Sequence, residues 1–233
     1  MLELNQIYNM DCMKGMAEFP NESVDFTLTD IPYAVVNRND NGLRSLNKGN
    51  ADVLVFDLEL FLNEVYRVTK NSICIFCSKE QFSFIYGYFA EKKGTVRPII
   101  WQKSNPSPMN GQHIYLSGVE FAVWFKKSGA KTFNAFCKNT VFKYPNGNNK
   151  IHPTQKNLDL FTELILDNTK TDDTVFDPCM GSATTALSSI KNNRKYIGFE
   201  LDCDYFNSAQ KRINDFKPQL TLFDLKGGGV WEF

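Results

Sequence analysis

Apolar residues recur along this chain with two different periods, and these periods predict where strands and helices lie. Short apolar runs bounded by turn residues predict buried strands, whereas apolar residues spaced three and four apart predict amphipathic helices. The predicted strands cover residues 24–29, 72–77, 96–101, 119–125, 174–177 and 196–199. The predicted helices cover residues 57–70, 80–92, 158–167, 184–191 and 203–216.

The order of these elements predicts an α/β fold. Strands that alternate with helices are joined by right-handed crossovers, which give a mainly parallel sheet covered on both faces. Ligands of such sheets bind beyond the carboxyl ends of the strands. We expect one domain over residues 1–217, with a small insertion at about 126–151 and a tail at 218–233. Residues 34–56 are polar and aperiodic, which is typical of a functional loop.

The composition is that of an ordinary globular protein, with 42% hydrophobic and 22% charged residues among 233. No apolar run reaches the roughly 20 residues that cross a bilayer, and the start does not resemble a signal peptide, so we expect a cytoplasmic protein. Six cysteines, at positions 12, 74, 77, 137, 179 and 203, are expected to be reduced thiols. Cys74 and Cys77 form one CxxC inside a predicted strand, without a second pair, so no metal site is expected.

Charge changes the picture only locally. Lys and Arg balance Asp and Glu at 26 each, and this neutral total argues against a nucleic-acid partner. Residues 126–150 nevertheless hold six lysines and no acidic residue, interleaved with Phe133, Phe136, Phe142 and Tyr144. A basic, aromatic segment favours contact with phosphates and bases. A solvated charged surface without a ligand is the alternative.

A strand, a turn of small residues and a helix start follow one another at residues 175–185. Gly181 and Ser182 let the backbone approach a ligand, and the free N–H groups of the helix start face it. Glu200 ends the next strand, where a Rossmann-like unit places the acid that binds ribose hydroxyls. Neither GxGxxG nor GK[ST] is present, so the pattern favours a nucleoside without phosphates. A capping turn with an incidental surface glutamate is the alternative.

A second motif, at residues 30–33, directly follows the strand at 24–29. Asp30 supplies a carboxylate, Ile31 and Pro32 supply backbone carbonyls, and Tyr33 supplies an aromatic face. Methylation of a base amine needs acceptors that hold the NH2 group and a platform on which the extruded base stacks. The tetrapeptide supplies these groups, but by itself a run of four residues is weak evidence for such chemistry.

Three segments together resemble the DNA amino-methyltransferases, in the permuted order in which the catalytic motif precedes the cofactor motif. They are residues 29–33 (TDIPY), similar to the D-P-P-Y of that family, residues 152–156 (HPTQK) and residues 176–182 (FDPCMGS). Residues 99–106 and 120–127 also resemble the family's central strands, so the resemblance spans nearly the whole chain. It implies a Rossmann-like methyltransferase with a mixed, mainly parallel, seven-stranded sheet and S-adenosyl-L-methionine as cofactor.

The resemblance also implies a role for each matching position. Asp30 and the carbonyls of Ile31 and Pro32 would hold the amine, and Tyr33 would stack on the base. Lys156 would bind the methionine carboxylate and Glu200 the ribose. The other implied cofactor contacts are Asp11, Cys12, Asp30, His152, Thr154, Gln155, Asp177, Pro178, Cys179, Gly181, Ser182, Thr184, Leu201 and Asp202. For His152, a loop histidine before a proline is the alternative.

Two positions depart from the family pattern. Ile31 replaces the first proline of the tetrapeptide, which keeps a carbonyl but loosens the turn, and Ala183 replaces a glycine after Ser182. Because Asp rather than Ser opens the tetrapeptide, the resemblance implies N6 of adenine as the methylated atom. N4 of cytosine presents the same kind of amine and is the first alternative. No metal is required, since the sulfonium is already activated.

Double-stranded DNA is the expected partner, for a monomer or a homodimer. Base flipping costs roughly a few kcal/mol, which contacts with the DNA backbone must offset. The candidates are Arg38, Arg44, Lys48, Lys126, Lys127, Lys131, Lys138 and Lys143. The grip on a planar amine also suits a methyltransferase of RNA or of protein glutamine, and the basic segment favours a nucleic acid without separating DNA from RNA. A DNA-binding module without catalysis is a further alternative, which Ile31 and Ala183 would support.

The sequence QLTLF follows the last predicted helix and Pro218, with Gln219, Leu220, Leu222 and Phe223 as its defining residues. It resembles the short QLxLF peptide by which bacterial replication proteins dock on the sliding clamp. An exposed Leu and Phe on a tail favour a partner. Packing back on the sheet as a final strand is the alternative.

Overall fold

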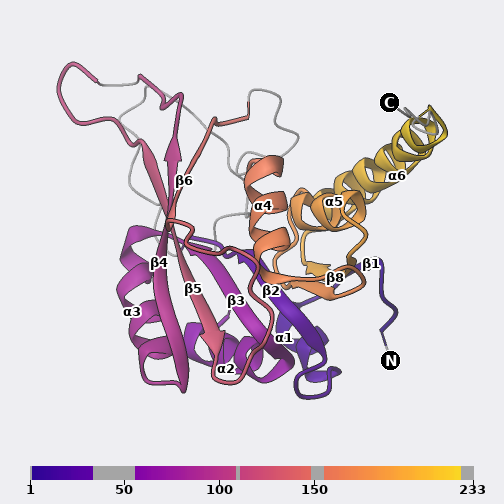
Figure 1. Cartoon of the computed structure of the whole chain (residues 1–233), viewed down its shortest axis with the longest axis horizontal. Helices are drawn as coiled ribbons and strands as arrows, with labels where there is room; N and C mark the ends of the chain where they lie inside the picture. Colours follow the sequence, from indigo (N-terminus) through magenta and orange to yellow (C-terminus); the bar gives the residue numbers. More distant parts are fainter. Residues whose placement is uncertain (1, 34–55, 109–110, 148–154, 227–233) are drawn as a thin grey trace, which may run out of the picture.

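The computed structural model describes residues 2–33, 56–108, 111–147 and 155–226, and for residues 217–226 it describes only the course of the helix. An eight-stranded sheet lies at the centre, in the order β1-β8-β7-β2-β3-β5-β4-β6 (Figure 1). The strands are β1 (Gln6–Asn9), β2 (Val24–Asp30), β3 (Thr69–Cys77), β4 (Gly94–Lys103), β5 (Val119–Lys127), β6 (Val141–Tyr144), β7 (Thr174–Asp177) and β8 (Lys195–Glu200). The helices are α1 (Cys12–Ala17), α2 (Leu58–Val68), α3 (Lys79–Ala90), α4 (Leu158–Asn168), α5 (Thr184–Lys191) and α6 (Cys203–Lys226).

Seven of these strands run in one direction, and β5 runs against them. The pairs of β1 with β8, β8 with β7, β7 with β2, β2 with β3 and β4 with β6 are parallel, whereas β5 is antiparallel to both β3 and β4. The mixed, mainly parallel sheet is therefore confirmed, with eight strands among the described residues where seven were expected.

The periodicity of the sequence did not predict β1 and β6. Each has four residues, lies at an edge of the sheet and buries only one of them, so neither shows a clear apolar period; β7 is equally short but lies inside the sheet and is buried throughout. β6 falls inside the stretch expected to be an insertion, yet it pairs with residues 100–103 of β4 and extends the sheet. That part of the stretch therefore belongs to the core fold.

Helices cover both faces of the sheet (Figure 1), and the alternation of side chains along β3 shows how. Ile73, Ile75 and Cys77 pack in one core with α1, α2 and α3, whereas Cys74 and Phe76 pack in another with α4. Because Cys74 and Cys77 lie on opposite faces, the CxxC does not present two thiols to one ion. Among the residues that the structure describes, no three His, Cys, Asp or Glu side chains gather as a metal site.

The site is positioned by β2 and β7, which are neighbours in the sheet although they are far apart in the sequence. The chain continues from β2 towards β3 on one side and from β7 towards β8 on the other. Strand order that diverges in this way leaves a crevice beyond the carboxyl ends of the two central strands. Asp30 ends β2 and Asp177 ends β7, so the two motifs meet at this crevice.

The last helix differs from the prediction. α6 continues to Lys226 instead of ending near residue 216, so QLTLF lies within a helix and neither in an extended tail nor in a strand. Pro218 removes one intrahelical hydrogen bond, but the Gln, Leu and Lys residues after it are good helix formers. Docking on a sliding clamp stays a prediction. None of the described helices has the length and apolar character of a membrane span.

Candidate active site

A cavity of about 520 Å³ lies in the crevice between the ends of β2 and β7. Its volume falls in the range of about 300–1,000 Å³ that is usual for small-molecule sites. Sixteen of the residues predicted from sequence line it: Asp11, Cys12, Asp30, Ile31, Pro32, Tyr33, Lys156, Asp177, Pro178, Cys179, Gly181, Ser182, Thr184, Glu200, Leu201 and Asp202. Both motifs therefore contribute to one cavity.

Asp177 anchors the turn that follows β7. Its buried carboxylate accepts a hydrogen bond from the Thr185 hydroxyl at 2.6 Å and another from the Cys179 backbone N–H at 3.1 Å. Burial raises the pKa of Asp177 to about 6, although the Thr185 hydroxyl works in the opposite direction. The carboxylate thus ties the end of the strand to the first turn of α5 and fixes the loop between them.

The same turn holds two residues with left-handed backbone conformations. Gly181 has φ of +51° and Ala183 has φ of +62°. For a residue with a Cβ this conformation costs roughly 1 kcal/mol, so the alanine that replaces the family's glycine keeps the turn at the expense of strain. The Ala183 N–H donates to the Met180 carbonyl at 2.9 Å and closes the turn.

Glu200 ends β8 and lines the same cavity. One carboxylate oxygen accepts from the Gly181 N–H at 2.8 Å and the other accepts from the Asp202 N–H at 2.9 Å. Burial raises the pKa of Glu200 despite these bonds. Each carboxylate oxygen has a second lone pair, so Glu200 can still accept hydrogen bonds from two vicinal hydroxyl groups of a ligand.

Lys156 lies directly beside the tetrapeptide. Its Nζ is 3.0 Å from Asp30 Oδ2, donates to the Tyr33 hydroxyl at 3.1 Å, and is 2.7 Å from Glu120 Oε2. An ammonium has three N–H donors, and these contacts use all three. The expected contact with a methionine carboxylate would have to compete with these contacts to Asp30, Tyr33 and Glu120.

Glu120 was missed by the sequence reasoning. It lies near the start of β5, and because β5 runs antiparallel, this start lies at the edge where the other strands end. Its second oxygen is 2.7 Å from Lys103 Nζ at the end of β4. The cluster thus alternates in charge, from Lys103 through Glu120 and Lys156 to Asp30.

The protonation states in this cluster follow from burial and from the alternating charges. Burial raises the pKa of Asp30 to about 7, although Lys156 lowers it. Burial would also raise the pKa of Glu120, but the ammonium groups of Lys156 and Lys103 bring it down to about 2. Burial opposes the charge of Lys156, but Asp30, Tyr33 and Glu120 raise its pKa well above the ordinary value. Asp30 is therefore the member that titrates near neutral pH.

The backbone of the tetrapeptide is held more firmly than the replacement of proline by Ile31 suggested. The Ile31 N–H, which a proline lacks, donates to the Phe76 carbonyl at 3.2 Å and prolongs the pairing with β3. The Ile31 side chain is buried in the core. The Pro32 carbonyl accepts from Gln81 Nε2 at 3.0 Å, and Gln81 also forms the capping box of α3 with Ser78.

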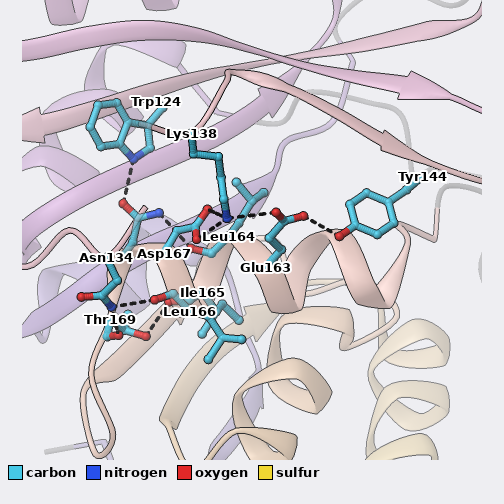
Figure 2. A network of polar contacts seen from close by, with 11 residues as sticks. Trp124, Asn134, Lys138, Tyr144, Glu163, Leu164, Ile165, Leu166, Asp167 and Thr169 are labelled. Atoms are coloured by element: carbon cyan, nitrogen blue, oxygen red, sulfur yellow. Dashed lines mark hydrogen bonds and ion pairs between the residues drawn. The ribbon is translucent and has the colours of Figure 1, made fainter. Parts of the chain in front are cut away.

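The predicted DNA contacts do not gather at this site. Lys126 and Lys127 lie at the end of β5. Because β5 is antiparallel, this end lies where the neighbouring strand β3 begins, at the strand ends opposite to those that carry the cavity. Lys127 pairs with Glu22. Figure 2 shows that the Lys138 ammonium lies between two carboxylates of α4, at 2.5 Å from Asp167 and 2.9 Å from Glu163. Lys127 and Lys138 thus have carboxylate partners within the protein, which leaves them less free for the phosphate contacts expected of them.

Other predicted positions fall in three groups. Lys143 is exposed near the end of β6, at the edge of the sheet that carries the cavity, and Lys131 is exposed in the connection between β5 and β6. Gln155 precedes Lys156 but is not part of the cavity lining. Five predictions lie outside the described residues: Arg38, Arg44, Lys48, His152 and Thr154.

Eight further residues line the cavity that the sequence did not predict as contacts: Met10, Phe56, Phe161, Met180, Thr185, Phe199, Cys203 and Tyr205. Most are immediate neighbours of predicted positions, and Thr185 is the second residue of α5, whose start was predicted. Gln81 carried a detectable signal, the capping-box spacing from Ser78. Glu120 carried none, because its role depends on strand direction.

Comparison with known proteins agrees with this geometry. The chain is 28% identical to the Type II methyltransferase M.HinfI of Haemophilus influenzae, over 95% of this chain and 72% of that protein. It is 25% identical to the Type II methyltransferase M2.MboI of Moraxella bovis, over 92% and 89%.

Two solved structures resemble this fold. The M1.HpyAVI–SAM complex has a TM-score of 0.69 and 30% identity, covering 89% of this chain and 98% of that one. The cytosine-N4-specific PvuII DNA methyltransferase, at 18% identity, has a TM-score of 0.72 over 92% of this chain and 91% of that one, and shows the fold alone. The family model described as DNA methylase matches residues 24–211, and the chain belongs to that DNA methylase family.

Proposed function

We propose that this protein transfers the methyl group of S-adenosyl-L-methionine to the N6 amine of adenine in double-stranded DNA. The observation that carries the proposal is the position of Asp30 and Tyr33 in the same cavity as Asp177 and Glu200. An acceptor for an amine and a cradle for a nucleoside therefore lie side by side at the ends of adjacent strands.

The residues present fit S-adenosylmethionine. Glu200 has acceptor capacity for ribose hydroxyls, and the loop fixed by Asp177 turns its backbone towards the cavity. Asp11 caps α1 through the Lys14 N–H at 3.0 Å and lines the same cavity beside Cys12. When bound, this cofactor supplies a methyl group already activated by a sulfonium. M1.HpyAVI, which is similar over most of the chain, has been solved with SAM.

The chain's own contribution is to hold the amine. In its ionised state Asp30 accepts an N–H of the target amine, which directs the nitrogen lone pair away from the carboxylate and towards the cofactor side of the cavity. The Pro32 carbonyl has one lone pair left beside its bond to Gln81, so it can accept the second N–H. Tyr33, held between Asp30 and Lys156, offers its ring to the extruded base.

The choice of adenine rests on Asp30. In the family that this chain resembles, Asp at this position accompanies adenine and Ser accompanies cytosine. The alternative product is N4-methylcytosine, because the amine of cytosine would meet the same acceptors. The two outcomes are separated by the modified nucleoside that appears.

The surface that meets DNA is proposed to be the edge of the sheet around the cavity. Lys143 is exposed there on β6. Between β4 and β5 the chain exposes three consecutive apolar residues, Ile114, Tyr115 and Leu116, and Tyr115 is fully exposed. This connection joins Lys103 at the end of β4 to Val119 at the start of β5, so it leaves the sheet at the strand ends that also carry the cavity. Exposed apolar side chains on it suit the stacking surface that an extruded base leaves behind.

The test is incubation with labelled S-adenosylmethionine and unmethylated genomic DNA, followed by mass spectrometry of the nucleosides. We expect N6-methyladenine from the wild type and none from Asp30→Asn. Asp25→Asn is the matched control, because Asp25 lies at the other end of β2. N4-methylcytosine would refute adenine as the base, and cofactor binding without label in DNA would refute the proposed reaction.

A further inference from the structure

The proposed reaction uses Asp30 to hold the amine, but it gives the other three members of the alternating cluster no part in holding it. These are Lys103, Glu120 and Lys156. Lys156 contacts both carboxylates through one nitrogen, at 3.0 Å to Asp30 and 2.7 Å to Glu120. The shorter distance is to Glu120, which has a second cation of its own in Lys103 at 2.7 Å. Two carboxylates thus compete for one buried ammonium.

We propose that Glu120, held by Lys103, is a positioning residue that sets how closely Lys156 binds Asp30, and therefore how readily Asp30 accepts the N–H of the target amine. This inference rests on the proposed function and extends it to residues outside the tetrapeptide. No hydrogen bond or ion pair joins Glu120 directly to the tetrapeptide in the described part of the chain, so Glu120 acts on Asp30 through Lys156 and through its own charge.

Burial gives the competition its strength. The Lys156 side chain is 6% exposed, so its charge is poorly screened and must be shared between its partners. Two carboxylates that contact one nitrogen lie within about 6 Å of each other, where like charges raise each other's pKa. Glu120 therefore affects Asp30 twice, by drawing Lys156 towards itself and by its own negative charge.

Asp30 is within reach of charged or titratable groups from every side. The groups that act on it or that it acts on are Lys156 before α4, Glu120 on β5, Asp177 at the end of β7, Tyr33 in its own motif and Cys77 on β3. Burial comes first among the causes that raise the pKa of Asp30 to about 7, and Glu120 adds to it. Removal of the Glu120 charge should therefore lower the pH at which Asp30 ionises.

The test uses Glu120→Gln, which keeps the shape and removes the charge. The rate of methyl transfer to DNA is measured from pH 5.5 to 9 with both substrates saturating. In the wild type the rate should rise through a midpoint near 7, as Asp30 ionises. In Glu120→Gln this midpoint should move down by about one pH unit. A loss of rate at every pH with an unmoved midpoint would mean that Glu120 is only structural, and would overturn the proposal.

Two further variants keep the test decisive. Lys103→Met should move the midpoint up, because Glu120 then has only Lys156 as a cation and draws it away from Asp30. Glu64→Gln is the matched control. Glu64 resembles Glu120 in pairing with a cation, Arg67 at 2.6 Å, and in its exposure, with 27% of its side chain exposed against 21% for Glu120. It lies on α2, outside the cluster. Its midpoint should equal that of the wild type.

A readout that needs no catalysis separates this inference from the proposed function. The 13C carboxyl shift of Asp30, assigned by its absence in Asp30→Asn, can be titrated in the cofactor-free protein. A lower midpoint in Glu120→Gln than in the wild type supports the inference even if no DNA is methylated. Equal midpoints would overturn it even if the wild type is fully active.

Discussion

Replacement of Gly198 by alanine is expected to destabilise the protein and to disturb the cofactor side of the cavity. Gly198 lies in β8 opposite Asp177 of β7. A Cβ at this position would lie 2.2 Å from Met180 Cε and 2.6 Å from the Asp177 carbonyl oxygen. The methionine end is flexible and can move, but the carbonyl belongs to the paired backbone and can move only if the strands separate.

The size of the effect follows from that difference. Overpacking of this kind costs about 1–3 kcal/mol. For a chain of this length each kcal/mol lowers the melting temperature by roughly 2–4 °C, so the melting temperature should fall by roughly 2–12 °C. Asp177 leads into the turn that lines the cavity, so part of the strain can be relieved by displacing that turn. If this part is about 1.4 kcal/mol, affinity for S-adenosylmethionine should fall about tenfold.

The matched control is Gly87→Ala, in the exposed interior of α3. A Cβ at Gly87 would meet nothing within 4 Å, so the same chemical change should stabilise the helix by about 0.5–1 kcal/mol. Thermal and urea unfolding of the two variants, with calorimetric titration of the cofactor, measure both effects. Melting temperatures that shift in the same direction in both variants, or an unchanged midpoint in Gly198→Ala, would refute this reasoning.

Three other outcomes are expected. Burial raises the pKa of Asp30 to about 7 and that of Asp177 to about 6, from 3.8, so the folded protein binds more protons than the unfolded chain between about pH 4 and 7. Its free energy of unfolding should therefore fall as pH rises through this window. Asp30→Asn should make that fall shallower in urea titrations at pH 5 and 7.5, and parallel slopes would contradict it. Lys143→Ala should reduce the salt dependence of DNA binding by about one unit of slope. Lys138→Ala should leave that slope unchanged and lower the free energy of unfolding, because Asp167 and Glu163 lose their cation. The reverse ranking in filter-binding assays would exclude the surface around Lys143 from the DNA interface. Tyr115→Ala should raise the KM for duplex DNA with the cofactor affinity unchanged, and an unchanged KM would remove Tyr115 from the DNA interface.

Local sequence was sufficient for the elements whose periodicity is strong. β7 and α5 have the predicted bounds, and α2 begins at the predicted Asp57 cap. The two motifs were recognisable because each is a contiguous run with its own chemistry. Their union in one cavity followed from the rule that parallel strands present their carboxyl ends at one edge.

Tertiary structure was needed for everything that depends on which distant residues become neighbours. Glu120 belongs to the site because β5 runs antiparallel and brings its start to the edge where β2 ends. Lys156 became a partner of Asp30 because both are buried beside each other, and Lys138 became a structural cation because α4 places two carboxylates around it. The sequence does not distinguish a lysine that binds a phosphate from one that binds a cofactor or a carboxylate. The groups that the folded chain brings within reach decide among these partners, and for the buried Lys156 the low dielectric strengthens its ion pairs.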